Sequence, residues 1–332
     1  MMKKWTFALI ILCSIGMLGC QKLSEIDQVV EIEETESNLL VGKPIETATE
    51  LQEDIPEIAP VVIEIIDPNT LETLYTFSPE ELGYEEDIET YKGKIVQLAK
   101  DLARGTDERT GYDQRMILDR IDEQGGIIKG SPLILLKESQ LVERILEATD
   151  VGGTVILPIE IFESGYDPGD VPNLDEVMVA SYTTYFNQAD TGRNRNIELS
   201  AQAIHNVIVG SGDYFSFNTV VGPRNEEKGY QPAPEIVNKE LVMGIGGGIC
   251  QTSSTMFNAI DQIPVKYVER HHHSLDIGYV PKGRDATVSY GGLDFRFQNT
   301  NEVPFMIKSI YGSQFLTIEI RTAAKFKDSL VR

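Results

Sequence analysis

A single cysteine beside a run of glycines is the residue in this chain best suited to covalent chemistry. Cys250 follows Gly246-Gly247-Gly248-Ile249 and is near the start of the helix-like segment 250–259. Glycines let a backbone turn sharply, and the first turn of a helix offers unpaired N–H groups and a partial positive charge. This setting predicts a lowered thiol pKa and hydrogen-bond donors for an oxyanion. Cys250 is therefore a candidate nucleophile for acyl transfer.

Two other interpretations apply to the same segment. A free cysteine is often a small buried hydrophobe that does no chemistry. A glycine-rich turn before a helix can also bind phosphate, although the Gly-Lys-Ser/Thr ending of a P-loop is missing here. The nucleophile interpretation requires, in addition, a base within hydrogen-bond reach of the thiol.

Three consecutive histidines, 271–273, could supply that base. If the segment is extended, His271 and His273 share one face and His272 points away. A catalytic histidine needs an orienting group, which is often a carboxylate. The carboxylates close enough in sequence to compete for this role are Glu269, Asp285 and Asp294.

A metal site is a rival interpretation of the same residues. Two histidines and one thiolate are sufficient protein ligands for a catalytic zinc ion. The chain lacks a second CxxC or HxxxH element with recognised ligand spacing, so no metal and no cofactor is predicted. The fourth histidine, His205, is expected to be a surface or hydrogen-bonded core residue.

The start of the chain is typical of an export signal. Lys3-Lys4 precede an apolar run over residues 5–18, and Gly19-Cys20 follow. A charged region, a short apolar region and a small residue before a cysteine favour a cleaved signal over a membrane span. The Met17–Cys20 segment resembles a bacterial lipobox, which implies that Cys20 is lipidated. The alternative is an uncleaved anchor, which would leave the domain on the same side of the membrane.

This processing would leave one free thiol. Cys13 is lost with the signal, Cys20 is acylated, and Cys250 has no partner for a disulfide. An exported protein with one remaining thiol is unusual. The thiol is therefore either buried and inert or kept for chemistry.

Net charge excludes one class of partner. The chain holds 29 basic and 52 acidic residues, a net charge of −23. Nucleic-acid partners need positive surface, so they are not expected. Residues 21–60 hold 11 Asp or Glu and two Lys without a sustained apolar period. This segment is predicted to be an acidic disordered tether that lifts the folded part from an anionic membrane.

Residues 61–175 are predicted to form a small α+β module. Residues 61–66 and 152–157 have strand character, and residues 89–104 and 139–148 have helical spacing of apolar residues. The module has no cysteine, no histidine and no clustered catalytic candidates, which favours a binding or spacer role.

Residues 176–325 are predicted to form a second domain with a helix-bearing core and a mostly antiparallel C-terminal sheet. Strand 177–186 is followed by a helix over residues 196–208. Later strands are predicted at 276–280, 286–290, 294–299, 305–311 and 315–320. The Gly312-Ser313 turn predicts a hairpin between the last two. The fold class is therefore α+β for the whole chain.

The motifs of residues 178–321 resemble the VanW-like domains of bacterial cell-envelope proteins. The matching segments are Ser181–Thr184, Arg193–Ile197, Phe215–Asn218, Val221–Arg224, Gly229-Tyr230, Gly246–Thr255, Glu269–Ser274, Tyr279–Val288 and Tyr290-Gly291. In this pattern His273 is the residue that matches the family histidine. Residues 76–83 and 133–158 also resemble a peptidoglycan-binding module that often precedes such domains.

The resemblance implies an extracytoplasmic lipoprotein that faces the cell wall and acts on peptidoglycan stem peptides. Some VanW-like domains have been linked to L,D-transpeptidation, which implies that Cys250 attacks a stem-peptide carbonyl. His273 would be base and acid, Asp285 or Asp294 would orient it, and backbone N–H groups near Cys250 and Gln251 would hold the oxyanion. The substrate-binding residues implied are Arg193, Arg195, Asn218, Arg224, Gly247, Gly248, Gln251, Ser253 and Tyr290.

Two other functions stay open at this point. A non-catalytic wall-binding or accessory protein would use the glycine-cysteine turn only as architecture. A cysteine hydrolase would use the same thiol but resolve its thioester with water. The arginines could equally be structural ion pairs.

Overall fold

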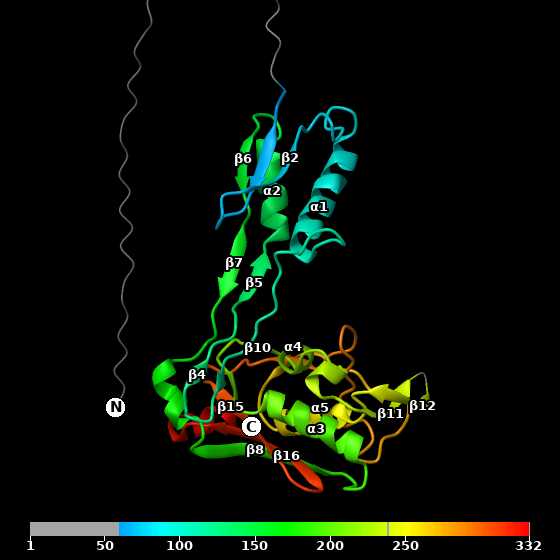
Figure 1. The fold of residues 1–332 in the computed structure, drawn as a ribbon. Coiled ribbons are helices and arrows are strands. Elements are labelled where there is room, and N and C mark those ends of the chain that lie inside the picture. The colour runs from blue at the N-terminus through cyan, green and yellow to red at the C-terminus, as the bar shows by residue number, and fades with distance from the viewer. Residues whose placement is uncertain (1–59, 238, 332) are drawn as a thin grey trace, which may run out of the picture. The chain divides into compact units, whose positions relative to one another are not determined.

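The computed structural model describes residues 60–237 and 239–331. The predicted signal, Cys20 and nearly all of the predicted tether lie outside these residues. The described chain has the predicted α+β architecture, with helices packed on mostly antiparallel sheets (Figure 1).

The N-terminal part packs two helices beside a small sheet. Strands β2, β1 and β6 form that sheet in this order, with β1 antiparallel to β2 and parallel to β6. Asp87 caps the first helix by accepting hydrogen bonds from the amides of Glu89 and Thr90, and Tyr91 and Ile95 are fully buried on its inner face. The elements are β1 (Ile63–Ile66), β2 (Thr73–Phe77), α1 (Ile88–Arg104), β5 (Leu133–Leu136), α2 (Glu138–Ala148), β6 (Gly153–Ile156) and β7 (Ile159–Phe162). The predicted helices and strands of this part are confirmed within two residues.

The C-terminal part is built around a six-stranded antiparallel sheet with the order β4-β3-β9-β15-β16-β8. Helices α3 and α5 pack against it through a large apolar core that includes Ile197, Phe257 and Ile318. The sheet strands are β3 (Arg120–Ile121), β4 (Ile127–Ile128), β8 (Val177–Tyr185), β9 (Val207–Val209), β15 (Phe305–Tyr311) and β16 (Phe315–Thr322). The predicted β15–β16 hairpin is confirmed.

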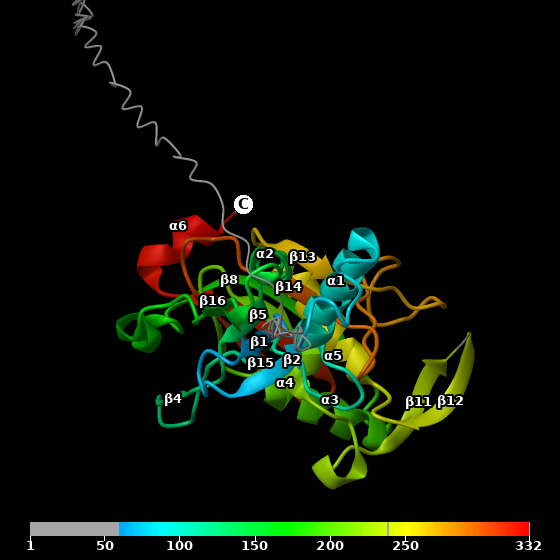
Figure 2. The same ribbon diagram turned by 90° about the horizontal axis from the view of Figure 1, so that it is seen from above.

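Shorter elements complete this part. Strands β10, β14 and β13 form a separate small sheet, and β11 pairs with β12 in a hairpin that projects beside α3 and α5 (Figures 1 and 2). The remaining elements are η1 (Pro168–Asn173), α3 (Thr191–Ile204), β10 (Tyr214–Ser216), α4 (Phe217–Val221), η2 (Glu226–Lys228), β11 (Pro232–Val237), β12 (Glu240–Ile245), α5 (Ile249–Ile260), β13 (Lys266–Glu269), β14 (Arg296–Gln298), η3 (Ala324–Phe326) and α6 (Lys327–Leu330).

The predicted boundary at residues 175 and 176 differs from the division between the two cores. Met116 and Leu118 belong to the core of the C-terminal part, and β3 pairs with β9 through Arg120 and Val207. The segment between α1 and β5 thus leaves the first sheet and extends the second. The apolar periodicity of the sequence does not predict this pairing, because strands of two residues are too short to show an alternating pattern.

Helix α5 is almost completely buried although its sequence is rich in hydroxyl and amide side chains. Each of these finds a partner on a neighbouring element: Thr255 bonds Thr184, Thr252 bonds Ser200, and Ser253 donates to the Ala286 carbonyl. Buried polar groups stabilise a fold only when they are paired in this way. The helix that carries Cys250 is therefore held in one position by many directional bonds.

Three predictions about local structure are wrong. Residues 276–280 and 286–290 are not strands. In the second segment, side chains of α5 satisfy the backbone of Ala286, whose amide donates to Ser254 Oγ and whose carbonyl accepts from Ser253. Helix α3 ends at Ile204, before Asn206 with a φ of 60°, and Ile208 lies on β9. The apolar residues of β9 continued the helical spacing only by coincidence.

The glycine turn before α5 has no space for a side chain. A Cβ at Gly247 would lie 2.5 Å from the Ala233 carbonyl oxygen and 2.6 Å from that of Pro234. We expect Gly247→Ala to lower the free energy of unfolding by about 2 kcal/mol, because backbone rather than a flexible side chain must move. Urea denaturation measures this. Gly278→Ala is the matched control, since nothing lies within 4 Å of its Cβ; equal stability of the two variants would contradict the expected crowding.

Candidate active site

One pocket brings the glycine turn, the cysteine and the histidine segment together. Its volume is about 610 Å³. The walls come from the turn 246–250, the β11–β12 hairpin, Arg193 on α3, Arg224, and the segment between His273 and Leu293. Residues more than 20 positions apart in sequence thus face the same space as Cys250.

Cys250 is the second residue of α5 and is only partly exposed to this pocket. Its thiol donates a hydrogen bond to the Val288 carbonyl, with a sulfur–oxygen distance of 3.4 Å. Burial raises the pKa of the Cys250 thiol above its usual value, and the positive charges of Arg224 and Arg193 offset this only in part. The predicted lowering of this pKa is therefore wrong, because burial outweighs the helix terminus. A nucleophilic role thus requires a base.

His273 and Asp285 form the pair that could supply this base. His273 Nδ1 lies 2.7 Å from Asp285 Oδ2, and the His273 amide donates to the same oxygen at 2.6 Å. An ionised carboxylate only accepts hydrogen bonds, so Nδ1 carries the proton and Nε2 is left as the acceptor. Among the described residues, His273 makes no hydrogen bond to Cys250, whose proton goes to Val288 instead. Such contacts often form only when substrate is bound.

Asp285 is itself strongly held. It is 5% exposed, and burial disfavours its charged form, but hydrogen bonds from His272 and His273 outweigh this and lower its pKa from 3.8 to about 2. A carboxyl group whose pKa is lowered by folding stabilises the fold at pH values above its pKa in the unfolded chain. This contribution is lost as the pH falls through its pKa in the folded protein.

We therefore expect wild type to be more stable than Asp285→Asn by about 2 kcal/mol at neutral pH because of this ionisation. The advantage should shrink as the pH falls from about 4 to about 2, where wild-type Asp285 becomes protonated. Thermal or urea unfolding of both proteins across this range measures it. A difference in stability that does not change with pH would show that the carboxylate charge contributes nothing.

Asp294 does not take the orienting role. Its carboxylate accepts from Ser216 Oγ at 2.6 Å and from the Asn218 amide at 2.9 Å, and it contacts Arg115 at 3.3 Å. It is 1% exposed and holds the junction at which β10 passes directly into α4. The alternative that Asp294 orients His273 is therefore wrong: its position is structural.

Two of the three predicted arginines line the pocket. Arg193 lies over the ring of Tyr279 and Arg224 over the ring of Tyr290, with guanidinium-to-centroid distances of 5.7 and 5.4 Å. Both terminal nitrogens of Arg224 are buried and have no hydrogen-bond partner within the described residues. Arg195 does not line the pocket: it is exposed and pairs with Glu198 on its own helix.

The other predicted binding residues divide into two groups. Gly247, Gly248 and Tyr290 line the pocket. Asn218, Gln251 and Ser253 do not, because their side chains bond the backbone of neighbouring segments: Asn218 donates to Ser289 and Leu293, and Gln251 to Tyr185. The Ile249 amide donates to the Gly246 carbonyl and the Gln251 amide to the Gly248 carbonyl, so that, within the described residues, the Cys250 amide between them is free of such a bond.

The other histidines have structural partners. His272 Nδ1 bonds Asp285, His271 Nε2 bonds Glu269, and His205 bonds the Ser309 backbone, as expected for a hydrogen-bonded core histidine. Within the described residues, no three His, Cys, Asp or Glu side chains are grouped so that they could hold a metal ion.

Sequence reasoning missed several pocket residues, among them Glu235, Tyr279 and Thr287. Glu235 lies on β11, and the sequence alone does not distinguish a pocket carboxylate on a strand from an ordinary exposed one. Tyr279 packs edge-on to His273 at 6.4 Å, and Thr287 has a buried hydroxyl without a partner in the described chain. Both lie within the motif 279–288, which could have drawn attention to them.

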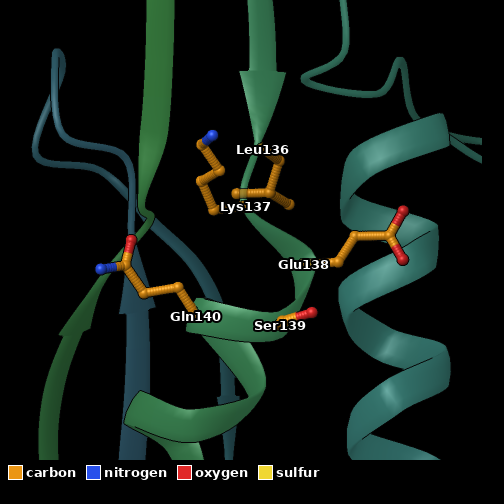
Figure 3. Close-up of a pocket in the computed structure, with 5 residues that line it drawn as sticks. All are labelled: Leu136, Lys137, Glu138, Ser139 and Gln140. Carbon is orange, nitrogen blue, oxygen red and sulfur yellow. The ribbon is translucent and has the colours of Figure 1, made fainter.

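A second hollow lies at the start of α2 and is lined by Leu136, Lys137, Glu138, Ser139 and Gln140 (Figure 3). Its charged groups already have partners, since Glu138 pairs with Arg104 and Lys137 with Glu160. It contains no nucleophile with a base and therefore offers no comparable chemistry.

Part of the chain is similar to known proteins. The family model described as VanW like protein matches residues 192–321. An uncharacterized protein, YoaR, from Bacillus subtilis is 51% identical over 143 residues, which are 42% of this chain and 47% of the relative. The vancomycin B-type resistance protein VanW from Enterococcus faecalis is 27% identical over 117 residues, which are 34% of this chain and 42% of the relative.

The aligned part covers less than half of either relative. No solved structure matches this chain. In the part of the chain that the structure describes, no helix has the length and apolar character that a membrane span requires. The family match contains Cys250, His273 and Asp285 together with the pocket arginines. Residues 192–321 of this chain are therefore a VanW-like domain.

Proposed function

We propose that this protein is an extracytoplasmic lipoprotein, anchored through Cys20, that crosslinks peptidoglycan stem peptides as a cysteine L,D-transpeptidase. The observation that carries the proposal is one pocket in which Cys250 faces the same space as a histidine held by a buried carboxylate. A relative named as a vancomycin resistance protein supports a place in the cell envelope.

The acylation step uses the groups that line the pocket. His273 Nε2 takes the proton from Cys250, and the thiolate attacks the carbonyl carbon of a stem-peptide bond. The carbonyl oxygen becomes an oxyanion, to which the free amide of Cys250 could donate. The C–N bond then breaks, and the leaving amine receives the proton from His273. A thioester on Cys250 and a released terminal residue are the products.

The second step transfers the acyl group. The amine of another stem attacks the thioester carbonyl and gives a proton to His273, after which the C–S bond breaks. The thiol recovers its proton, so the new amide bond forms without oxidant or reductant. Asp285 keeps the imidazole in the tautomer that both steps need. The raised pKa of Cys250 makes this base necessary, because little thiolate exists before substrate binds.

The N-terminal part of the chain would bind the glycan or stem peptides near the anchor. Its resemblance to a peptidoglycan-binding module and its compact core around α1 and α2 support this role. Two alternatives differ in what happens at the thiol: a hydrolase would resolve the thioester with water, and an accessory protein would form no thioester.

Intact-mass spectrometry of the full-length protein with disaccharide tetrapeptide stems tests the proposal. We expect an adduct on Cys250 whose mass corresponds to loss of the terminal residue, together with crosslinked dimer. Adduct formation with only shortened monomer would establish the hydrolase. A folded protein that forms neither adduct nor product across several stem chemistries would overturn the enzymatic function.

A further inference from the structure

Glu235 is a charged group in the pocket that the acyl-transfer chemistry leaves without a role. It lies on β11, is partly buried and lines the same pocket as the thiol. A Cβ at Gly244 on the neighbouring strand would come 2.0 Å from Glu235 Oε1, so the carboxylate lies over a position that only glycine leaves open. Burial raises the pKa of Glu235 above its usual value. The hairpin thus accommodates a carboxyl group against the pocket.

Arg224 is the opposite charge on this pocket, and in the described chain its terminal nitrogens also lack a hydrogen-bond partner. The rings of Phe217 and Tyr290 hold its guanidinium at 5.8 and 5.4 Å. Its two terminal nitrogens are nevertheless buried without a hydrogen bond in the described chain. A buried guanidinium without an acceptor is costly, and a carboxylate is the ligand that pairs with it in bidentate geometry.

The two charges do not neutralise each other. Within residues 60–237 and 239–331, Glu235 forms no ion pair with Arg193 or with Arg224. Opposite charges that share a pocket without contact are complementary to a ligand that carries both an ammonium and a carboxylate.

We propose that Glu235 and Arg224 bind the zwitterionic end of an amino acid, in which one carbon carries both an ammonium and a carboxylate. The free end of a diamino dicarboxylic acid side chain has this chemistry, whereas a lysine-type side chain lacks the carboxylate. The role of this end rests on the proposed function: it supplies the amine that resolves the thioester. Glu235 accepts one proton from the ammonium, and the neutral amine then attacks the thioester carbon.

Binding of simple probes tests the subsite without turnover. Titration calorimetry compares meso-diaminopimelic acid with cadaverine, which has only amines, and with pimelic acid, which has only carboxylates. The full-length Cys250→Ala protein is used, so that no reaction intervenes. We expect the diamino diacid to bind at least about tenfold more tightly than either probe, because each charged pair contributes separately.

Two variants and a control assign the residues. Glu235→Gln should weaken binding of the diamino diacid about tenfold and leave the affinity for pimelic acid unchanged. Arg224→Gln should weaken binding of both acids and leave the affinity for cadaverine unchanged. Glu240→Gln is the control, because Glu240 is exposed on the same hairpin and outside the pocket. Equal affinity for all three probes, or no effect of Glu235→Gln in a folded protein, would overturn the subsite. A protein that binds the diacid selectively but never forms a thioester would retain the subsite and lose the proposed transpeptidation.

Discussion

Cys250→Ala is expected to abolish formation of the covalent stem-peptide adduct and to lower crosslinking by about 10³-fold or more, while the protein stays folded. The thiol is the sulfur nucleophile that faces the pocket, and its hydrogen bond to Val288 is weak. Removing one sulfur and one weak hydrogen bond should lower the free energy of unfolding by about 1 kcal/mol or less. Intact-mass spectrometry and urea denaturation of the same samples measure both effects.

This variant separates catalysis from architecture. If Cys250 were only a packing residue, its loss would lower stability and leave any wall-related activity proportional to the folded fraction. Thr252→Val is a matched control on the same helix: Thr252 is fully buried and bonds Ser200, so its replacement should lower stability without removing the nucleophile. Full adduct formation by Cys250→Ala would exclude the thioester mechanism.

The elements of the fold were predictable to different degrees. Long periodic segments such as α1, β15 and β16 have enough residues for the apolar pattern to fix their type. Short strands such as β9 and β3 do not, and the sheet order depends on them. The β11–β12 hairpin was missed because its exposed residues Leu241 and Met243 give no alternation between a buried and a polar face.

A segment that lines the pocket, residues 286–290, was wrongly predicted to be a strand. Residues 286–290 alternate as a strand does, yet they extend along α5 and bond its hydroxyl groups instead of another strand. Backbone groups can be satisfied by side chains as well as by a sheet, and local sequence does not distinguish the two. The same contacts bring Val288 to the thiol and Asp285 to His273.

For the site itself, residue type and spacing indicated the nucleophile and its base but not their surroundings. Asp285 and Asp294 were equivalent in sequence. Only three-dimensional contacts distinguish Asp285, which holds His273, from Asp294, which accepts from the Asn218 amide at the start of α4. The thiol pKa was predicted in the wrong direction because burial by the hairpin and by segment 279–290 could not be seen in the sequence. Glu235 was missed for the same reason.

The contrast between the two aspartates gives the second large expected effect. Asp285→Asn should lower the rate of Cys250 acylation by about 10² to 10⁴-fold, because an amide can donate to Nδ1 and favour the tautomer in which Nε2 carries the proton. Asp294→Asn should leave the acylation rate of the folded protein within about threefold, because Asp294 contacts Ser216 and the Asn218 amide rather than the imidazole.

Both variants should be less stable than wild type, but the order is reversed, because Asp294→Asn should lose more stability than Asp285→Asn. Asp294→Asn replaces a nearly fully buried acceptor of several hydrogen bonds, so it should lower the free energy of unfolding by about 3 kcal/mol. Single-turnover acylation followed by intact mass, corrected for the folded fraction from urea denaturation, measures both properties. His273→Ala shows how far the acylation rate falls when the base is removed. If Asp294→Asn slowed acylation as much as Asp285→Asn, the carboxylates would act as one electrostatic unit, and the orientation of His273 by Asp285 would not be what drives the chemistry.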